Sequence, residues 1–293
     1  MLFRSIMKNS HLLTLSAIVL SSFSSIAQPR FYPAESRGEI ENQQINEASG
    51  LAVGINNPDM LWTHNDSGDA ARIFLLDQYG KFKAEYTFPK ITNRDWEDMS
   101  SGPGPDPKKN YLYIAEMGDN KAVHEIKYIY RFEEPDFKNP NREIADVDVI
   151  SFIFPDGKRD AESMIVDPQT KDIYILSKRE QIIGIYKMPY PQSTTDIITL
   201  EKVGTLPYFN TVAMDITIDG KEIITKTYDT VFYWERKDGA TIEETLMSTP
   251  EIVPYIIEPQ GEALGWKKDG SGFFTLSEEP RDIEAILYYY RKK

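Results

Sequence analysis

The chain has 293 residues, and 46 acidic against 33 basic side chains give it a formal net charge of −13. Nucleic acids and other polyanions are not expected partners, because binding them requires a basic stripe that the sequence lacks. The chain has no cysteine, which excludes disulfides, thiol nucleophiles and cysteine-ligated zinc.

The N-terminal segment has the pattern of a signal peptide. Arg4 and Lys8 precede an apolar run over residues 12–20, and a serine-rich stretch ends at Ala27. The run is too short for a permanent transmembrane anchor, although an uncleaved anchor is the alternative interpretation. We therefore expect residues 1–27 to be removed and the protein to be exported, either periplasmic or secreted. We also expect it to be a monomer without an integral membrane segment.

An internal repeat predicts the fold. Residues 94–99 and 159–164 share four of six residues, residues 47–51 resemble 262–266, and a degenerate copy lies at 213–216. The acids of these copies are 47 to 65 residues apart, which is the period of a propeller blade. The five acids are Glu47, Glu97, Glu162, Asp215 and Glu262.

Each repeat also contains strand-forming runs and turn residues. β-Branched and aromatic runs follow each acid, and Asn, Asp, Gly and Pro lie between the runs. We therefore predict an all-β fold in which residues 28–293 form one domain, a five-bladed β-propeller. The fifth repeat has no fourth strand, so residues 38–43 are expected to complete the last blade near Leu287 and cover its edge.

The five acids are predicted at the start of the innermost strands, where they would surround the channel. Like charges held close together raise one another's pKa or bind a cation, and a ring of oxygens suits Ca²⁺ or another divalent cation such as Mg²⁺. The sequence therefore predicts Glu47, Glu97, Glu162, Asp215 and Glu262 as metal ligands. The alternative is a ring of solvated acids in a wet channel.

The ends of the second strands are expected on the same face as the acids, because neighbouring strands are antiparallel. We interpret His64 and Asp66 as candidate proton-transfer groups, although the segment around them also has turn chemistry. Lys178 and Lys226 are candidates to hold a phosphate or carboxylate, or else to form internal ion pairs. The further predicted substrate-binding residues are Asp119, Asn120 and Glu278.

On these repeated acids the chain resembles two groups of exported propellers, the calcium-activated nucleotidases (apyrases) and the phytase-like esterases. In the nucleotidases five blades surround a central Ca²⁺, so the resemblance implies that the matching acids face a metal and that a phosphorylated small molecule binds there. Asp215 and the loop over residues 64–69 depart from that pattern.

The function predicted from the sequence is therefore metal-dependent hydrolysis of a phosphoester. Two alternatives remain open. One is a non-catalytic propeller that binds a glycan, a peptide or an envelope partner. The other is a glycan-cleaving enzyme that uses paired carboxylates.

Overall fold

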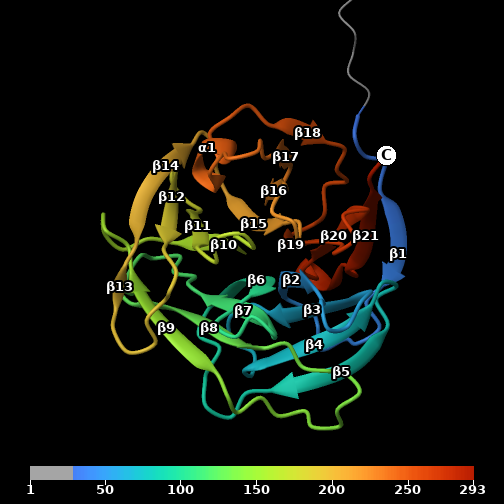
Figure 1. The fold of residues 1–293 in the computed structure, drawn as a ribbon. Coiled ribbons are helices and arrows are strands. Elements are labelled where there is room, and N and C mark those ends of the chain that lie inside the picture. Colours follow the sequence, from blue (N-terminus) through green and yellow to red (C-terminus); the bar gives the residue numbers. More distant parts are fainter. Residues whose placement is uncertain (1–28) are drawn as a thin grey trace, which may run out of the picture.

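Five small β-sheets surround a central channel in the computed structural model, which describes residues 29–293 (Figure 1). Neighbouring strands of each sheet are antiparallel, apart from one two-residue strand, and their order runs from the channel to the rim. The chain therefore forms a five-bladed β-propeller, as the sequence predicts. The predicted signal peptide, residues 1–27, lies outside the described residues.

The blades are numbered in chain order and consist of β2–β5, of β6–β9, of β10–β12 with β14, of β15–β18, and of β19–β21 with β1. The innermost strands are β2 (Ala48–Val53), β6 (Trp96–Pro103), β10 (Ala161–Val166), β15 (Thr211–Ile216) and β19 (Gly261–Trp266). The second strands are β3 (Met60–Asn65), β7 (Asn110–Glu116), β11 (Ile173–Ser177), β16 (Glu222–Thr227) and β20 (Gly272–Ser277). The third strands are β4 (Arg72–Asp77), β8 (Lys127–Glu133), β12 (Ile183–Met188), β17 (Val231–Glu235) and β21 (Ile286–Arg291). The outer strands are β5 (Phe82–Thr87), β9 (Asp148–Ile153), β14 (Glu201–Leu206), β18 (Glu251–Val253) and β1 (Glu35–Glu39).

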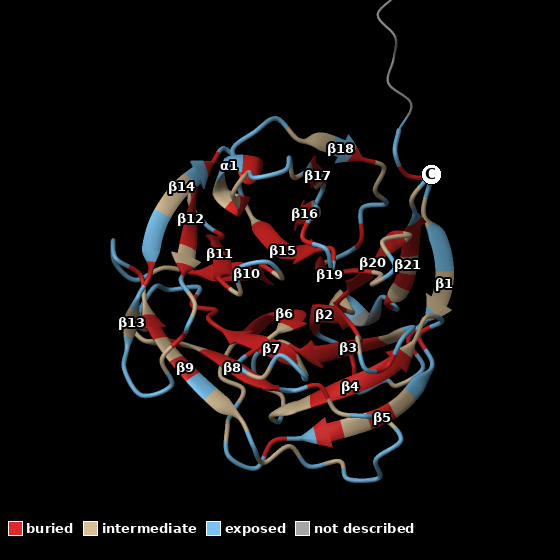
Figure 2. Ribbon diagram, in the orientation of Figure 1, coloured by how far each residue is buried: buried red, intermediate tan, exposed pale blue. Residues whose placement is uncertain are grey.

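Burial decreases from the channel to the rim (Figure 2). Four of the five innermost strands are buried along their whole length, and β6 is buried up to its last residue. The outer strand β5 instead alternates, with Ala84 and Tyr86 buried between more exposed neighbours. This period of two is expected for a strand with one face against its neighbours and one toward water.

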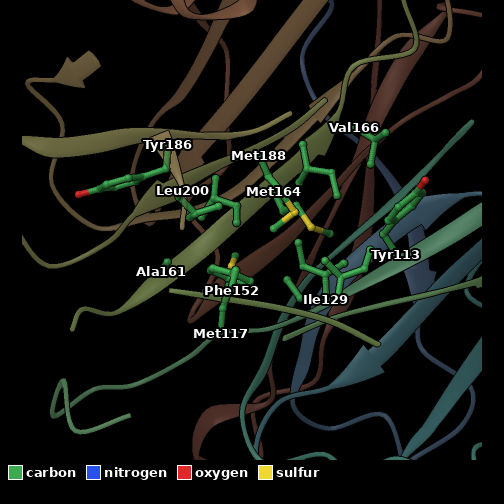
Figure 3. Packing of buried hydrophobic residues seen from close by; sticks show 14 of the residues in the cluster. Tyr113, Met117, Ile129, Phe152, Ala161, Met164, Val166, Tyr186, Met188 and Leu200 are labelled. Atoms are coloured by element: carbon green, nitrogen blue, oxygen red, sulfur yellow. The ribbon is translucent and has the colours of Figure 1, made fainter. Parts of the chain in front are cut away.

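The apolar side chains form five clusters, each between two adjacent blades. Between blades 2 and 3, for example, Ile129 and Phe152 pack with Met164 and Tyr186 (Figure 3). Such contacts between neighbouring sheets stabilise the ring by removing apolar surface from water.

The ring is closed by the N-terminal strand, as predicted, but not over the predicted residues. β1 pairs with β21 in blade 5, with Gly38 opposite Leu287. The prediction of a strand over residues 38–43 is wrong at four of its six residues, because the strand begins at Glu35 and already ends at Glu39. Beyond it the chain turns, and the amide of Ile45 donates to the carbonyl of Asn42.

Three short elements lie outside the four-stranded pattern. β13 (Ile198–Thr199) leaves blade 3 and pairs in parallel with β9 of blade 2. The helix α1 (Ile242–Leu246) begins at the capping residue Thr241, and the 3₁₀ turn η1 (Pro280–Asp282) precedes β21. Within residues 29–293, no helix has the length and apolar character needed to cross a membrane.

Candidate functional site

Each innermost strand carries an irregularity near its start, and this feature positions the acids. The pairing with the second strand shifts by one residue after the first paired residue in all five blades. Such bulges re-aim side chains next to functional sites. The residues that directly follow the first paired residue are Ser49, Glu97, Glu162, Val212 and Glu262.

Three of the five predicted acids converge. Glu97, Glu162 and Glu262 are buried, and each offers a carboxylate oxygen within 4.8 Å of those of the other two. Glu47 does not join them, because it lies before β2 and is exposed. Asp215 lies deeper in its strand, four residues after the first paired residue, Thr211. Its carboxylate accepts hydrogen bonds from the amide of Ile216 in its own blade and from the amide of Trp266 in the next blade. The predicted ring of five acids is therefore wrong at these two positions.

A second layer of polar residues lies directly after the second strands. Asp66, Lys178, Tyr228 and Glu278 occupy equivalent places in blades 1, 3, 4 and 5, and Met117 takes this place in blade 2. Together with Asp95, two of these residues enlarge the acidic cluster. The carboxylates that lie within 4.8 Å of one another form three overlapping triads, Asp66–Asp95–Glu97, Asp66–Glu262–Glu278 and Glu97–Glu162–Glu262.

One lysine is embedded in the cluster. The Lys178 ammonium pairs with Glu162, lies 3.5 Å from Glu262 and donates to the Tyr228 hydroxyl at 3.0 Å. Tyr228 in turn donates to Glu262. Burial alone lowers the pKa of Lys178, but the surrounding carboxylates raise it above its ordinary value. Lys178 is therefore positively charged and balances part of the acid cluster.

The positive charge nearby is too small to keep the pKa values of the other acids of the cluster in their usual range. Burial and the neighbouring Glu162 raise the pKa of Glu97 well above its usual range. Burial also raises the pKa of Asp66 to about 7, and burial together with Glu262 raises that of Glu278 to about 9. Without a further cation, several of these groups would hold protons at neutral pH.

Asp98 follows Glu97 in β6, and its carboxylate accepts backbone hydrogen bonds next to the cluster. One oxygen of Asp98 accepts from the amide of Met99 at 2.8 Å. The other accepts from the amides of Met164 in blade 3 and Met214 in blade 4, at 2.8 and 3.3 Å. One carboxylate therefore links three innermost strands across the channel beneath the cluster.

A cavity of about 190 Å³ lies at the opposite end of the channel. Its lining residues include Ile55, Gly102, Val166, Ile216 and Lys268, which lie at or just beyond the far ends of the innermost strands. The acidic cluster and this cavity are thus at different ends of the ring.

A glycine makes room for the acids of blade 2. A Cβ atom on Gly118 would overlap Oε1 of Glu97 and lie 2.6 Å from Oδ2 of Asp95, which is closer than real Cβ contacts. A larger residue at position 118 would therefore have to displace one or both carboxylates.

His64 does not reach the cluster. Its ring is fully buried and lies edge to face with Trp96 of the next blade at 5.4 Å. Nδ1 lies 3.0 Å from the carbonyl of Asn65, and Nε2 has no hydrogen-bond partner among the described residues. Burial lowers the pKa of His64 to about 4, so the ring is neutral. The prediction that His64 is a proton-transfer group on this face is therefore wrong.

Lys226 also points away from the cluster. Its ammonium is buried, donates to the carbonyl of Gly261 and lies 3.3 Å from Glu258. Lys226 has the same place in blade 4 that His64 has in blade 1, and both side chains contact the following blade. The prediction that Lys226 holds a substrate anion is wrong, whereas the alternative of an internal ion pair is correct.

The two predicted binding residues of blade 2 lie elsewhere. Asp119 is buried, pairs with Lys127 at 2.9 Å and accepts from the amides of Val123 and His124, so it orders its own loop. Asn120 is exposed. Neither residue belongs to the three carboxylate triads.

Sequence reasoning missed Asp95 and Tyr228. Asp95 lies in the repeated segment that identified Glu97, and its counterpart in blade 3 is Asp160. Tyr228 follows its second strand as Lys178 does. An alignment of all five repeats on their strand ends would have included both residues.

Comparisons with known proteins show no family for this chain. Neither a protein-family model nor a curated protein matches it. Solved structures do match, and one of them is described as the structure of the Dos1 propeller. The two chains are 10% identical with a TM-score of 0.39, over 83% of this chain and 68% of that one. The resemblance to the calcium-activated nucleotidases and phytase-like esterases stays a prediction.

Proposed function

We propose that the protein is an exported, metal-dependent hydrolase in which the acidic cluster at one end of the channel binds a divalent cation, preferably Ca²⁺, and acts on a phosphoester. The observation that carries this proposal is the set of three overlapping carboxylate triads. Six carboxylates share a site in which, within residues 29–293, Lys178 is the one basic residue with an ion pair to a triad member. So many acids in contact favour a further cation.

The donor set fits a hard divalent cation. All the ligand atoms in the triads are carboxylate oxygens, which Ca²⁺ and Mg²⁺ prefer over softer metals. Glu97 belongs to two triads and is only 4% exposed, yet among the described residues its carboxylate accepts no hydrogen bond and forms no ion pair. A buried, unpartnered carboxylate is costly unless something neutralises it. A bound cation would supply that partner.

The chain's own residues would serve hydrolysis in distinct ways. A divalent cation held here would polarise an ester oxygen and offset negative charge. Burial raises the pKa of Asp66 to about 7, and a cation bound beside it would lower that pKa and hold the carboxylate ionised as a ligand. Lys178 is bound to Glu162 and Glu262 and offsets their charge. Without the cation, the cluster would repel an anionic phosphoester, so the activity should depend strictly on metal.

A second candidate, glycan cleavage, is favoured by the pair of Glu262 and Glu278. The pKa of Glu278 is raised to about 9 by burial and by the charge of the neighbouring Glu262. A carboxylic acid that stays protonated can act as the general acid of glycoside hydrolysis, which also uses a second carboxyl group about 5–9.5 Å away. Glycan cleavage would not need the cation, so metal dependence separates the two candidates.

The test is a hydrolase screen on purified protein, with phosphatase, nucleotidase and glycosidase substrates assayed in Ca²⁺, in Mg²⁺ and in EDTA. We expect turnover of a phosphoester that EDTA abolishes and that Asp66→Asn lowers at least tenfold, because Asp66 belongs to two of the three triads. Asn120→Ala is the matched control, because Asn120 lies on an exposed loop outside the triads. Turnover of a glycoside that persists in EDTA would favour the second candidate. No turnover at all would leave a binding propeller.

A further inference from the structure

We propose that Lys178 is a resident cation of the acidic cluster. Its ammonium occupies the Glu97–Glu162–Glu262 side and so directs the divalent cation to Asp66, Asp95 and Glu97. This inference rests on the proposed metal site and identifies its ligands. The three triads alone do not distinguish between positions for a cation, because all of them meet the same distance criterion.

The contacts of Lys178 distinguish two sides of the acidic cluster, one in blades 3 to 5 and one in blades 1 and 2. Its ammonium forms ion pairs with Glu162 and Glu262 and donates a hydrogen bond to the Tyr228 hydroxyl. The side chain is 5% exposed, and the ammonium also lies over the Tyr228 ring at 5.1 Å. Lys178 is thus held on the side of blades 3 to 5, and among the described residues it forms no ion pair within 4 Å with the acids of blades 1 and 2.

The acids of blades 1 and 2 have no such partner. Among the described residues, Asp66, Asp95 and Glu97 form no ion pair within 4 Å. Two basic residues act on Asp95 from farther away, but Arg94 binds Glu116 at 3.1 Å and Lys127 binds Asp119 at 2.9 Å. The nearest basic groups therefore pair with carboxylates outside this triad, although Nη2 of Arg94 is buried without a hydrogen-bond partner among the described residues.

Two independent observations point to a ligand at this triad. The Glu97 side chain is 4% exposed and, among the described residues, forms no ion pair, and one oxygen of Asp66 is buried without a hydrogen-bond partner. Gly118 also leaves the space that Glu97 and Asp95 share. In contrast, the acids next to Lys178 already have a charged neighbour that would repel a second cation.

Each triad contains one residue that the other two lack, which allows a direct test. These residues are Asp95, Glu278 and Glu162. Isothermal titration with CaCl₂ on Asp95→Asn, Glu278→Gln and Glu162→Gln compares the three positions with isosteric, neutral replacements. We expect Asp95→Asn to weaken Ca²⁺ binding at least tenfold and by a larger factor than either of the other two. A larger loss in Glu278→Gln or Glu162→Gln would overturn the assignment.

Replacing the resident cation provides the second test. In Lys178→Met the aliphatic length is kept and the charge is removed, so Glu162 and Glu262 should accept a second Ca²⁺ or the affinity should rise about tenfold or more. Unchanged stoichiometry and affinity in a folded Lys178→Met protein would overturn the proposal. If this variant does not fold, the three carboxylate variants decide.

The same titration separates this inference from the proposed function. If the wild type binds no Ca²⁺ but Lys178→Met binds it, Lys178 is the resident cation and the metal-dependent function fails. If neither protein binds Ca²⁺, both proposals fail. Circular dichroism of each variant, compared with the wild type, provides the folding control.

Discussion

Replacing Asp98 by asparagine should lower the stability of the ring substantially, although the shape of the side chain hardly changes. In Asp98→Asn, one carboxylate oxygen becomes an NH₂ group that must face a backbone amide, because the two oxygens together accept from Met99, Met164 and Met214. At least one backbone amide then loses its acceptor, and the new NH₂ group and this amide face each other as two donors in a buried position.

The expected magnitude follows from these bonds. A hydrogen bond contributes about 0.5–1.5 kcal/mol net, and a buried donor left without an acceptor costs about 1–3 kcal/mol. We expect Asp98→Asn to lower the free energy of unfolding by about 2–4 kcal/mol, and Asp98→Ala, which removes all three bonds, by about 3–5 kcal/mol. These values are a large fraction of the roughly 5–15 kcal/mol that stabilises a typical domain.

Urea unfolding followed by tryptophan fluorescence measures the effect. Ser100→Ala is the matched control, because Ser100 lies in the same strand and its buried hydroxyl has no hydrogen-bond partner among the described residues. This control should be neutral or slightly stabilising. An Asp98→Asn protein within about 0.5 kcal/mol of the wild type would refute the view that Asp98 links three blades.

Three further predictions follow from the structure. Deletion of residues 29–43 removes β1 and exposes the edge of β21, so the protein should aggregate on size-exclusion chromatography; a monodisperse, cooperatively folded deletion protein would count against closure by this strand. Gly118→Ala should displace Glu97 and weaken Ca²⁺ binding about tenfold in calorimetric titration, and unchanged affinity would show that the space is not needed. Burial raises the folded-state pKa values of Asp66 and Glu278 to about 7 and 9, so in EDTA the folded state binds more protons than the unfolded state. The melting temperature in EDTA should therefore fall as pH rises from about 5 to 9, whereas Ca²⁺ affinity should rise over the same range. A melting temperature in EDTA that rises with pH throughout this range would contradict this prediction.

The fold could be predicted from the sequence because the blade pattern is local. Each blade repeats buried strand runs and turns, and the spacing of the repeats gives the number of blades. The bounds of the closing strand were less accessible. β1 has the sequence Glu-Ser-Arg-Gly-Glu, and none of its residues is fully buried. A strand held mainly by backbone pairing leaves no hydrophobic pattern to read.

The candidate site was only partly predictable, because residue identity is a poor guide to register. Glu97 and Glu162 were placed correctly, since the segments around them match without a shift. Glu47 was matched with Glu262 by similar neighbours, but the pairing with the second strands places them two residues apart in the repeat. Asp215 was misaligned by three residues in the same way. A one-residue slip changes the face on which a strand side chain lies.

The errors at His64 and Lys226 have a common cause. The equivalent residues in the other blades are Ala115, Leu176 and Leu276, and all three are fully buried. The position is therefore a core position between blades, where two repeats happen to carry a polar residue. The composition of this position across the repeats was a usable signal, whereas the network of Lys178, Tyr228 and Glu262 depends on contacts between blades that no local pattern records.

The most direct test of the account is calorimetric titration of CaCl₂ into the wild type and into Glu97→Gln, with the melting temperature measured in Ca²⁺ and in EDTA. We predict saturable binding to the wild type and stabilisation that reaches about 2.7 kcal/mol at a hundredfold excess of Ca²⁺ over Kd. Glu97→Gln should bind at least tenfold more weakly, because Glu97 belongs to two of the three triads. A wild type that shows no binding heat and no change in melting temperature with Ca²⁺, Mg²⁺, Mn²⁺ or EDTA would contradict a cation site at the end of this channel.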